Sequence, residues 1–181
     1  MADANIADVE RYKEESRRQG EPIHTEEQRF VLQVVQPGLA GLMDGSVSTL
    51  APIFATAFAT HKPHTVFLVG LAAAVGAGIS MAFSEGLSDD GTLTGRGNPI
   101  MRGAITGVMT FLGGLGHTLP FLLPSIHAAL ILAYVIVGIE LIIIAFIRNK
   151  YFQMRFLTSF VQVVFGGALV FLAGILIGSS G

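Results

Sequence analysis

The sequence predicts an all-α membrane protein with five transmembrane helices. Its 181 residues are 51% hydrophobic and only 13% charged, whereas a soluble domain carries about 25% charged residues. The mean hydropathy is +0.63. Thirteen charged residues crowd into residues 1–30, and the remainder is apolar with short interruptions. We therefore expect a charged cytosolic N-terminal segment, 1–30, followed by a five-helix transmembrane domain, 31–181.

Each apolar stretch reaches the roughly 20 residues that a helix needs to cross a bilayer. The first is preceded by Thr25-Glu26-Glu27-Gln28, which has capping-box spacing and predicts a helix that continues into the first span. The third and fourth spans form a tight hairpin whose connection holds Pro120 and Pro124. The five expected spans are about 38–59, 66–87, 101–122, 126–147 and 156–178.

The basic residues predict an orientation. With five spans, ten of the eleven Lys and Arg fall on the side of the N-terminus, and only Lys62 falls on the other. The positive-inside rule then places the N-terminus in the cytosol and the C-terminus outside. No apolar segment of a signal peptide appears in the first 30 residues, so the first span is expected to direct its own insertion.

Several function classes lack support in the sequence. The chain has no cysteine, which excludes disulfides, thiolate metal sites and thiol catalysis. It shows no nucleophile motif, no phosphate-binding glycine loop and no metalloprotease motif. A net charge of −2 gives no indication of nucleic-acid binding. We expect neither an enzyme nor a bound prosthetic group.

Acidic residues inside apolar spans are the main functional candidates, because a charge in the bilayer is costly without a partner or water. Asp44 lies deepest, in the otherwise uncharged stretch 31–60. Glu85 lies near the predicted cytosolic end of the second span. Glu140 stands alone in the fourth span, where a proton relay, a dimer contact or a partner for a basic residue are open alternatives.

Helical spacing places two of these acids on polar, small-residue stripes. Gly41, Asp44 and Ser48 share one face, and Met81 stands one turn before Glu85 on the second span. Met43 is adjacent to Asp44. Carboxylate oxygen combined with thioether sulfur suits a borderline transition metal such as Fe²⁺ better than Ca²⁺ or Mg²⁺. Met43 and Met81 are also common as apolar packing residues.

Glycines and histidines add two weaker indications. The pairs Gly103/Gly107, Gly70–Gly78 and Gly166-Gly167 predict close helix approach, within the chain or in a homodimer. Four of the five histidines fall near the predicted outer face, where imidazole could assist metal release or do nothing specific. They are His61, His64, His117 and His127.

Two motifs carry a resemblance to a known family. Gly41-Leu42-Met43-Asp44-Gly45-Ser46-Val47-Ser48-Thr49 resembles the first-helix signature of the vacuolar iron transporter family. Gly78-Ile79-Ser80-Met81-Ala82-Phe83-Ser84-Glu85 resembles its second-helix motif. The resemblance covers about residues 30–181. Within the family, the sequence is most similar to the membrane unit of bacterial membrane-bound ferritin, without the ferritin-like domain.

The resemblance implies a homodimeric exporter of Fe²⁺ or Mn²⁺, working by metal/proton antiport in the bacterial inner membrane. Asp44, Met81 and Glu85, with Met43, would then be metal ligands, and the metal would be the transported ion rather than a cofactor. The Glu-rich domain that many members carry after the second helix is absent from the short connection Ser88 to Pro99. A separate ferritin-like chain is a possible partner. The alternative is a membrane metal sensor, or a subunit of a larger metal-handling complex, that does not transport.

Overall fold

The computed structural model describes residues 26–91 and 94–180, and the described chain is helical without a β-strand. The first long helix consists of α2 (Glu26–Phe30), a π-helical turn η1 (Val31–Val35), α3 (Gln36–Ser48) and α4 (Leu50–Thr60). The later elements are α5 (Pro63–Gly86), α6 (Pro99–Gly116), the 3₁₀ turn η2 (Leu119–Leu122), α7 (Ile126–Phe152) and α8 (Phe156–Ser179).

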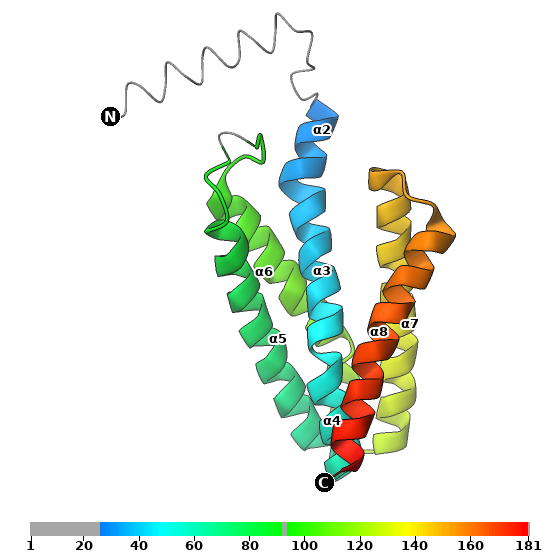
Figure 1. The fold of residues 1–181 in the computed structure, drawn as a ribbon. Coiled ribbons are helices and arrows are strands. Elements are labelled where there is room, and N and C mark those ends of the chain that lie inside the picture. The colour runs from blue at the N-terminus through cyan, green and yellow to red at the C-terminus, as the bar shows by residue number, and fades with distance from the viewer. Residues whose placement is uncertain (1–25, 92–93, 181) are drawn as a thin grey trace, which may run out of the picture.

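The helices form an elongated up-and-down bundle (Figure 1). The α2 end of the bundle also carries the α5–α6 and α7–α8 connections, and the opposite end carries the α4–α5 turn, η2 and the C-terminus. The basic loops are thus grouped at one end, as the charge pattern predicts. Which end faces the cytosol stays a prediction.

Two prolines interrupt the regular hydrogen bonding of the first long helix. Pro37 has no N–H to give to a carbonyl four residues earlier, and just before it the N–H of Gln36 bonds to the carbonyl of Val31, five residues back. Pro52 likewise cannot bond to Ser48, and the helix breaks at Thr49 between α3 and α4. The break at Thr49 lies in the middle of the bundle.

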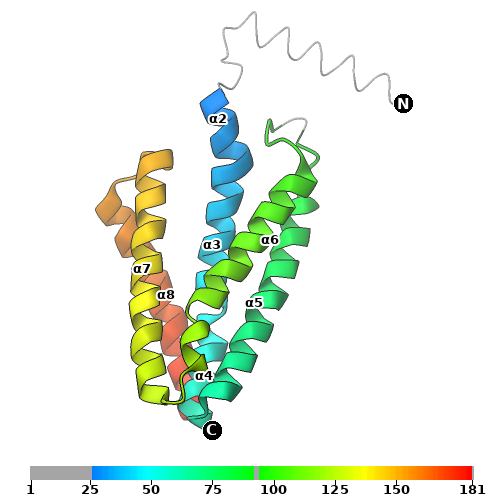
Figure 2. The ribbon, with the colours of Figure 1, turned by 180° about the vertical axis from the view of Figure 1, so that it is seen from behind.

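Helix α6 packs between α3 and α5 (Figure 2), and glycines on both sides allow backbone contact. On α3, a Cβ at Gly41 or Gly45 would collide with the backbone carbonyl oxygen of Thr106 or Thr110. On α6, a Cβ at Gly107 would lie 2.7 Å from the carbonyl oxygen of Gly78. This side of the bundle is therefore joined largely backbone to backbone, as small-residue helix pairs are in membranes.

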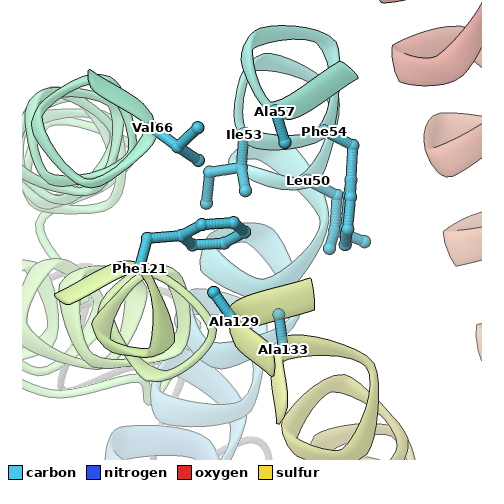
Figure 3. Packing of buried hydrophobic residues seen from close by; sticks show 8 residues of the cluster. All are labelled: Leu50, Ile53, Phe54, Ala57, Val66, Phe121, Ala129 and Ala133. Atoms are coloured by element: carbon cyan, nitrogen blue, oxygen red, sulfur yellow. The ribbon is translucent and has the colours of Figure 1, made fainter. Parts of the chain in front are cut away.

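The largest apolar core lies toward the α4 end (Figure 3). The ring of Phe121 from η2 lies among side chains of α4, α5 and α7, so the 3₁₀ turn is anchored inside the bundle. The buried residues of this core are Leu50, Ile53, Phe54, Ala57, Val66, Phe121, Ala129 and Ala133.

Four helical stretches are long and apolar enough to cross a membrane: Glu26–Thr60, Pro63–Gly86, Ile126–Phe152 and Phe156–Ser179. They match the first, second, fourth and fifth expected spans, and the first begins twelve residues earlier than expected because the helix continues from Glu26. The expected third span, 101–122, forms α6 and η2 instead of one continuous helix. Helix α6 has 18 residues and contains the fully buried Arg102. A fifth crossing stays a prediction.

The glycine predictions are correct in part. Gly70, Gly78, Gly103 and Gly107 lie against neighbouring helices, whereas Gly166 has open space around it. The close approach of α8 to α4 instead uses Gly174 and Gly178, which face the backbone of Ala51 and Ala55.

We expect Gly45→Ala to destabilise the bundle, because the new methyl group would displace α3 from the Thr110 carbonyl. Overpacking of this kind costs about 1–3 kcal/mol. Gly166→Ala is the matched control, since it meets open space. Thermal unfolding in detergent should show a lower midpoint for Gly45→Ala alone, and equal midpoints would contradict the packing described.

Candidate functional site: an aspartate in an apolar helix and two polar clusters

Asp44 lies on a partly exposed face of α3. Ala40 and Ser48, one turn before and after it, are exposed, and Asp44 itself is partly buried. Within residues 26–91 and 94–180, no side chain forms an ion pair with its carboxylate. Among the described residues, Asp44 is thus a carboxylate without an ion-pair partner within an apolar helix.

Met43 lies on a different side of α3 from Asp44, because successive helical residues are about 100° apart. It packs against the buried cluster of Leu39, Ile144 and Val163, which joins α3 to α7 and α8. Packing in this cluster accounts for Met43 without a metal. Its role as a ligand stays a prediction.

Glu85 is held by arginines at the end of α5. Arg96 Nη2 donates to Glu85 Oε1 at 2.6 Å, and Arg102 Nε lies 3.1 Å from the same oxygen. Arg102 is fully buried, while the Glu85 side chain is 15% exposed. Sequence reasoning found the acid and missed the two arginines, which are 11 and 17 residues further along the chain.

Asp89 completes this cluster of two acids and two arginines. Arg102 donates to both its side chain and its backbone carbonyl, each at 3.1 Å, and Arg96 donates to its other carboxylate oxygen at 3.1 Å. The hydrogen bond from Arg102, with those from the Gly91 N–H and the Thr94 hydroxyl, lowers the pKa of Asp89 to about 2. The cluster is therefore charge-balanced, and it fixes the start of the α5–α6 loop to α6.

The structure places Glu85 away from Asp44 along the bundle. Gly45, beside Asp44, contacts α6 at Thr110, and Gly86, beside Glu85, contacts α6 at Gly103. These α6 positions are seven residues apart, or about 10 Å at 1.5 Å per residue.

Met81 lies closer to the level of Asp44. The neighbouring Ala82 contacts α6 at Gly107, three residues from Thr110 and so about 5 Å along the axis. Met81 is partly buried. In the part of the chain that the structure describes, no group of three or more His, Asp or Glu is placed to hold a metal ion.

A second polar cluster lies where two helix breaks meet. His117 caps the C-terminus of α6 and is fully buried. Its Nε2 is 2.7 Å from the hydroxyl of Thr49, at the α3–α4 break, and its Nδ1 is 3.2 Å from Glu140 Oε2 on α7. Glu140 is thus hydrogen-bonded to a histidine, which agrees with one of the three alternatives that the sequence left open. The sequence did not identify His117 as the partner, because 23 residues and a hairpin separate the two.

The other histidines of the described chain are exposed. His61 ends α4 in a left-handed conformation with φ 54°, and His64 and His127 lie near the starts of α5 and α7. His24 lies outside the described residues. Only His117, of the four histidines expected near one face, makes contacts that define a specific site.

A cavity of about 390 Å³ opens beside the arginine cluster, between η1 and the start of α6. Gln33 lines this cavity, and its side-chain Nε2 donates to the carbonyl oxygen of Gly95 at 3.3 Å. This hydrogen bond joins the first long helix to the α5–α6 loop. The cavity lies toward the α2 end and is lined by Gln33, Val34, Asn98, Ile100, Met101, Arg102 and Ala104.

The charge on Asp89 should stabilise the protein only above strongly acidic pH. Its folded pKa, about 2, lies below the ordinary 3.8, so the contribution is complete above pH 3.8 and disappears as the pH falls through about 2. Thermal midpoints of wild type and Asp89→Asn should differ by a few degrees at pH 5 and converge by pH 2. A difference that persists unchanged at pH 2 would contradict this assignment.

One family comparison bears on these residues. Residues 35–91, which include Asp44, Met81, Glu85 and Asp89, match the VIT family. No curated protein and no solved structure matches the chain. Members of the VIT family are transporters, and the four long apolar helices of this chain point to an integral membrane protein. The similarity of residues 35–91 to the VIT family supports the resemblance to the vacuolar iron transporter family.

Proposed function

We propose that this protein is a divalent-metal transporter that moves Fe²⁺, or Mn²⁺, out of the cytosol in exchange for protons. The observation that carries the proposal is the carboxylate of Asp44. It lies in an apolar helix, within the segment that matches a family of transporters, and no ion pair with a described residue neutralises it. An ionisable group in such a place is a functional candidate by default.

Asp44 and Met81 are the metal-binding residues in this proposal. Their helices, α3 and α5, pack on neighbouring faces of α6 and contact each other, and the levels of the two residues along α6 differ by about one turn. A hard oxygen and a soft sulfur together favour a borderline divalent ion over Ca²⁺ or Mg²⁺. Water would complete the coordination, as the partial exposure of both residues allows.

Glu85 has a different part in the proposal. Because Arg96 and Arg102 already neutralise it, a metal ion can bind Glu85 only if at least one guanidinium group moves away. Glu85 is therefore placed on the approach path, beside the cavity near Gln33, and the ion passes from there to Asp44. Met43 is a secondary candidate on the far side of α3.

The exposed face around Asp44 supports a homodimer. Ala40 and Ser48 are exposed beside Asp44, and lipid in contact with the carboxylate would be unfavourable by several kcal/mol. A second copy placed against this face would shield the carboxylate and enclose a water-filled path. We place the dimer in the bacterial inner membrane, with the α2 end toward the cytosol because the basic loops gather there.

Protons drive the cycle by competing with the metal for the carboxylates. A deprotonated carboxylate binds the ion, and protonation from the outer side weakens the binding and releases it. The resting protein requires no prosthetic group in this scheme.

We expect Asp44→Asn to lower Mn²⁺ uptake into proteoliposomes by about tenfold or more. The substitution keeps the size of the side chain and removes a charged ligand, a loss of about 1.5–3 kcal/mol. Gly166→Ala, which meets open space on α8, is the control. Met81→Leu, which keeps the volume and removes the sulfur, should reduce uptake of Fe²⁺ more than that of Mn²⁺.

The same assay separates the alternatives. Parental uptake by Asp44→Asn would refute the assigned site, and absence of uptake by the wild type for Fe²⁺, Mn²⁺ and Zn²⁺ would refute transport. Metal binding without uptake, lost on removal of residues 1–25, would favour a sensor. Uptake that appears only with an added ferritin-like chain would favour a subunit of a larger complex.

A further inference from the structure

His117, Thr49 and Glu140 form a continuous hydrogen-bonded chain that crosses the bundle from α3 to α7. The chain begins at the carbonyl of Gly45, the residue after Asp44, which accepts the Thr49 hydroxyl at 2.8 Å. It continues from Thr49 Oγ1 to His117 Nε2 at 2.7 Å and from His117 Nδ1 to Glu140 Oε2 at 3.2 Å. Thr49 and His117 are fully buried, and the Glu140 side chain is 12% exposed.

The number of available hydrogen-bond donors determines which ring nitrogen of His117 carries a proton. The Thr49 hydroxyl has a single proton, and the bond to the Gly45 carbonyl uses it. Thr49 Oγ1 is therefore the acceptor in its contact with the ring, and Nε2 of His117 must donate. The neutral ring with a proton on Nε2 has a bare Nδ1, which faces Glu140 Oε2.

A second proton is needed between Nδ1 and the carboxylate, because two bare acceptors at this distance would repel each other. That proton resides either on Nδ1, as an imidazolium–carboxylate pair, or on Oε2, as a carboxylic acid beside a neutral ring. Both arrangements have zero net charge, which is the favoured total for a pair enclosed by apolar helices. Loss of the shared proton would leave one negative charge.

The elements around this pair carry few other titratable or charged groups, and most of those lie at helix ends. Helices α4 and α8 and the turn η2 carry no titratable side chain. On α5 the titratable groups, His64 and Glu85, lie at the two ends, and on α6 the only charge is Arg102. Helix α7 adds Tyr134, which stacks on Phe54, and groups at its ends, so Asp44 on α3 is the nearest mid-helix acid.

The backbone is shaped to admit the carboxylate. A Cβ at Gly116 on α6 would collide with Glu140 Oε1, so the absence of a side chain there makes room for the acid. Helix α6 ends at His117 and the first long helix breaks at Thr49, and these two breaks meet inside the bundle. Interrupted helices of this kind, enclosed by protein, are typical of ion sites in membrane transporters.

We propose that His117 and Glu140 form a proton-binding site inside the membrane, which holds one shared proton at rest and releases it when a divalent cation binds at Asp44. The proposal rests on the proposed function for the cation. Release breaks the bond of the shared proton to Nδ1 or Oε2, and the proton leaves to water past the partly exposed Glu140. The pair then bears one negative charge, which with ionised Asp44 balances a divalent cation.

The distance permits this coupling. Thr49 is five residues beyond Asp44, a separation of about 7 Å along the axis. A cation at Asp44 would therefore act on the shared proton from about 10 Å through apolar protein, where charges are screened far less than in water. Thr49 is a positioning residue in this scheme, since it selects the tautomer of His117.

Proton release on metal binding tests the proposal. Detergent-solubilised protein in weakly buffered solution receives saturating Mn²⁺, while a pH dye counts protons and electron paramagnetic resonance counts bound Mn²⁺. We expect Glu140→Gln and His117→Gln to release one proton fewer per bound ion than the wild type. Gly116→Ala, which displaces the carboxylate, should resemble them, and Gly138→Ala, which meets open space on α7, should resemble the wild type.

Equal proton release by the wild type and Glu140→Gln would overturn the proposal. A second measurement does not depend on the metal: the ¹⁵N spectrum of histidine-labelled protein, with His117→Gln identifying the signal, should show a proton on Nε2 in the wild type. A bare Nε2 would also overturn it. If the wild type binds no Mn²⁺, the proposed function fails, and the ¹⁵N spectrum still decides whether the pair holds its shared proton.

Discussion

The backbone contact of α6 with its two neighbours is the constraint on which the rest of the structure depends. Glycines on α3 and α6 bring three helices so close that little side-chain volume separates them. The same contacts set the levels of the acids, since Asp44 and Glu85 are each adjacent to a glycine that touches α6. Arg102 and His117, at the two ends of α6, are thereby brought to Glu85 and Glu140.

The three acids of the apolar bundle differ in the basic groups that lie beside their carboxylates. Glu85 is neutralised by two arginines, and Glu140 is hydrogen-bonded to the buried His117. Asp44 forms no ion pair with any residue in 26–91 or 94–180. A divalent cation binds most readily where a carboxylate is not already neutralised, because displacing a buried partner leaves that partner unpaired. This difference distinguishes Asp44 from the two glutamates.

Composition and periodicity predicted the helical fold and the four long apolar helices, because these depend on local sequence. The partners of the acids could not be predicted in the same way. Arg102 reaches Glu85 only through the path of the α5–α6 loop, and His117 reaches Glu140 only because α6 stops short and η2 turns the chain. The break at Thr49 was recognisable in principle, since Pro52 cannot bond to the fourth residue before it. The close contact at Gly174 and Gly178 required knowledge of which face of α8 meets α4.

The position of the bound metal tests the central claim most directly. Crystals of the protein soaked in Mn²⁺ and measured by anomalous scattering would locate the ion without any assumption about transport. Our account predicts a peak in contact with the Asp44 carboxylate, on the partly exposed face between Ala40 and Ser48. A peak at Glu85 and Asp89 with none at Asp44, under conditions that saturate binding, would contradict it.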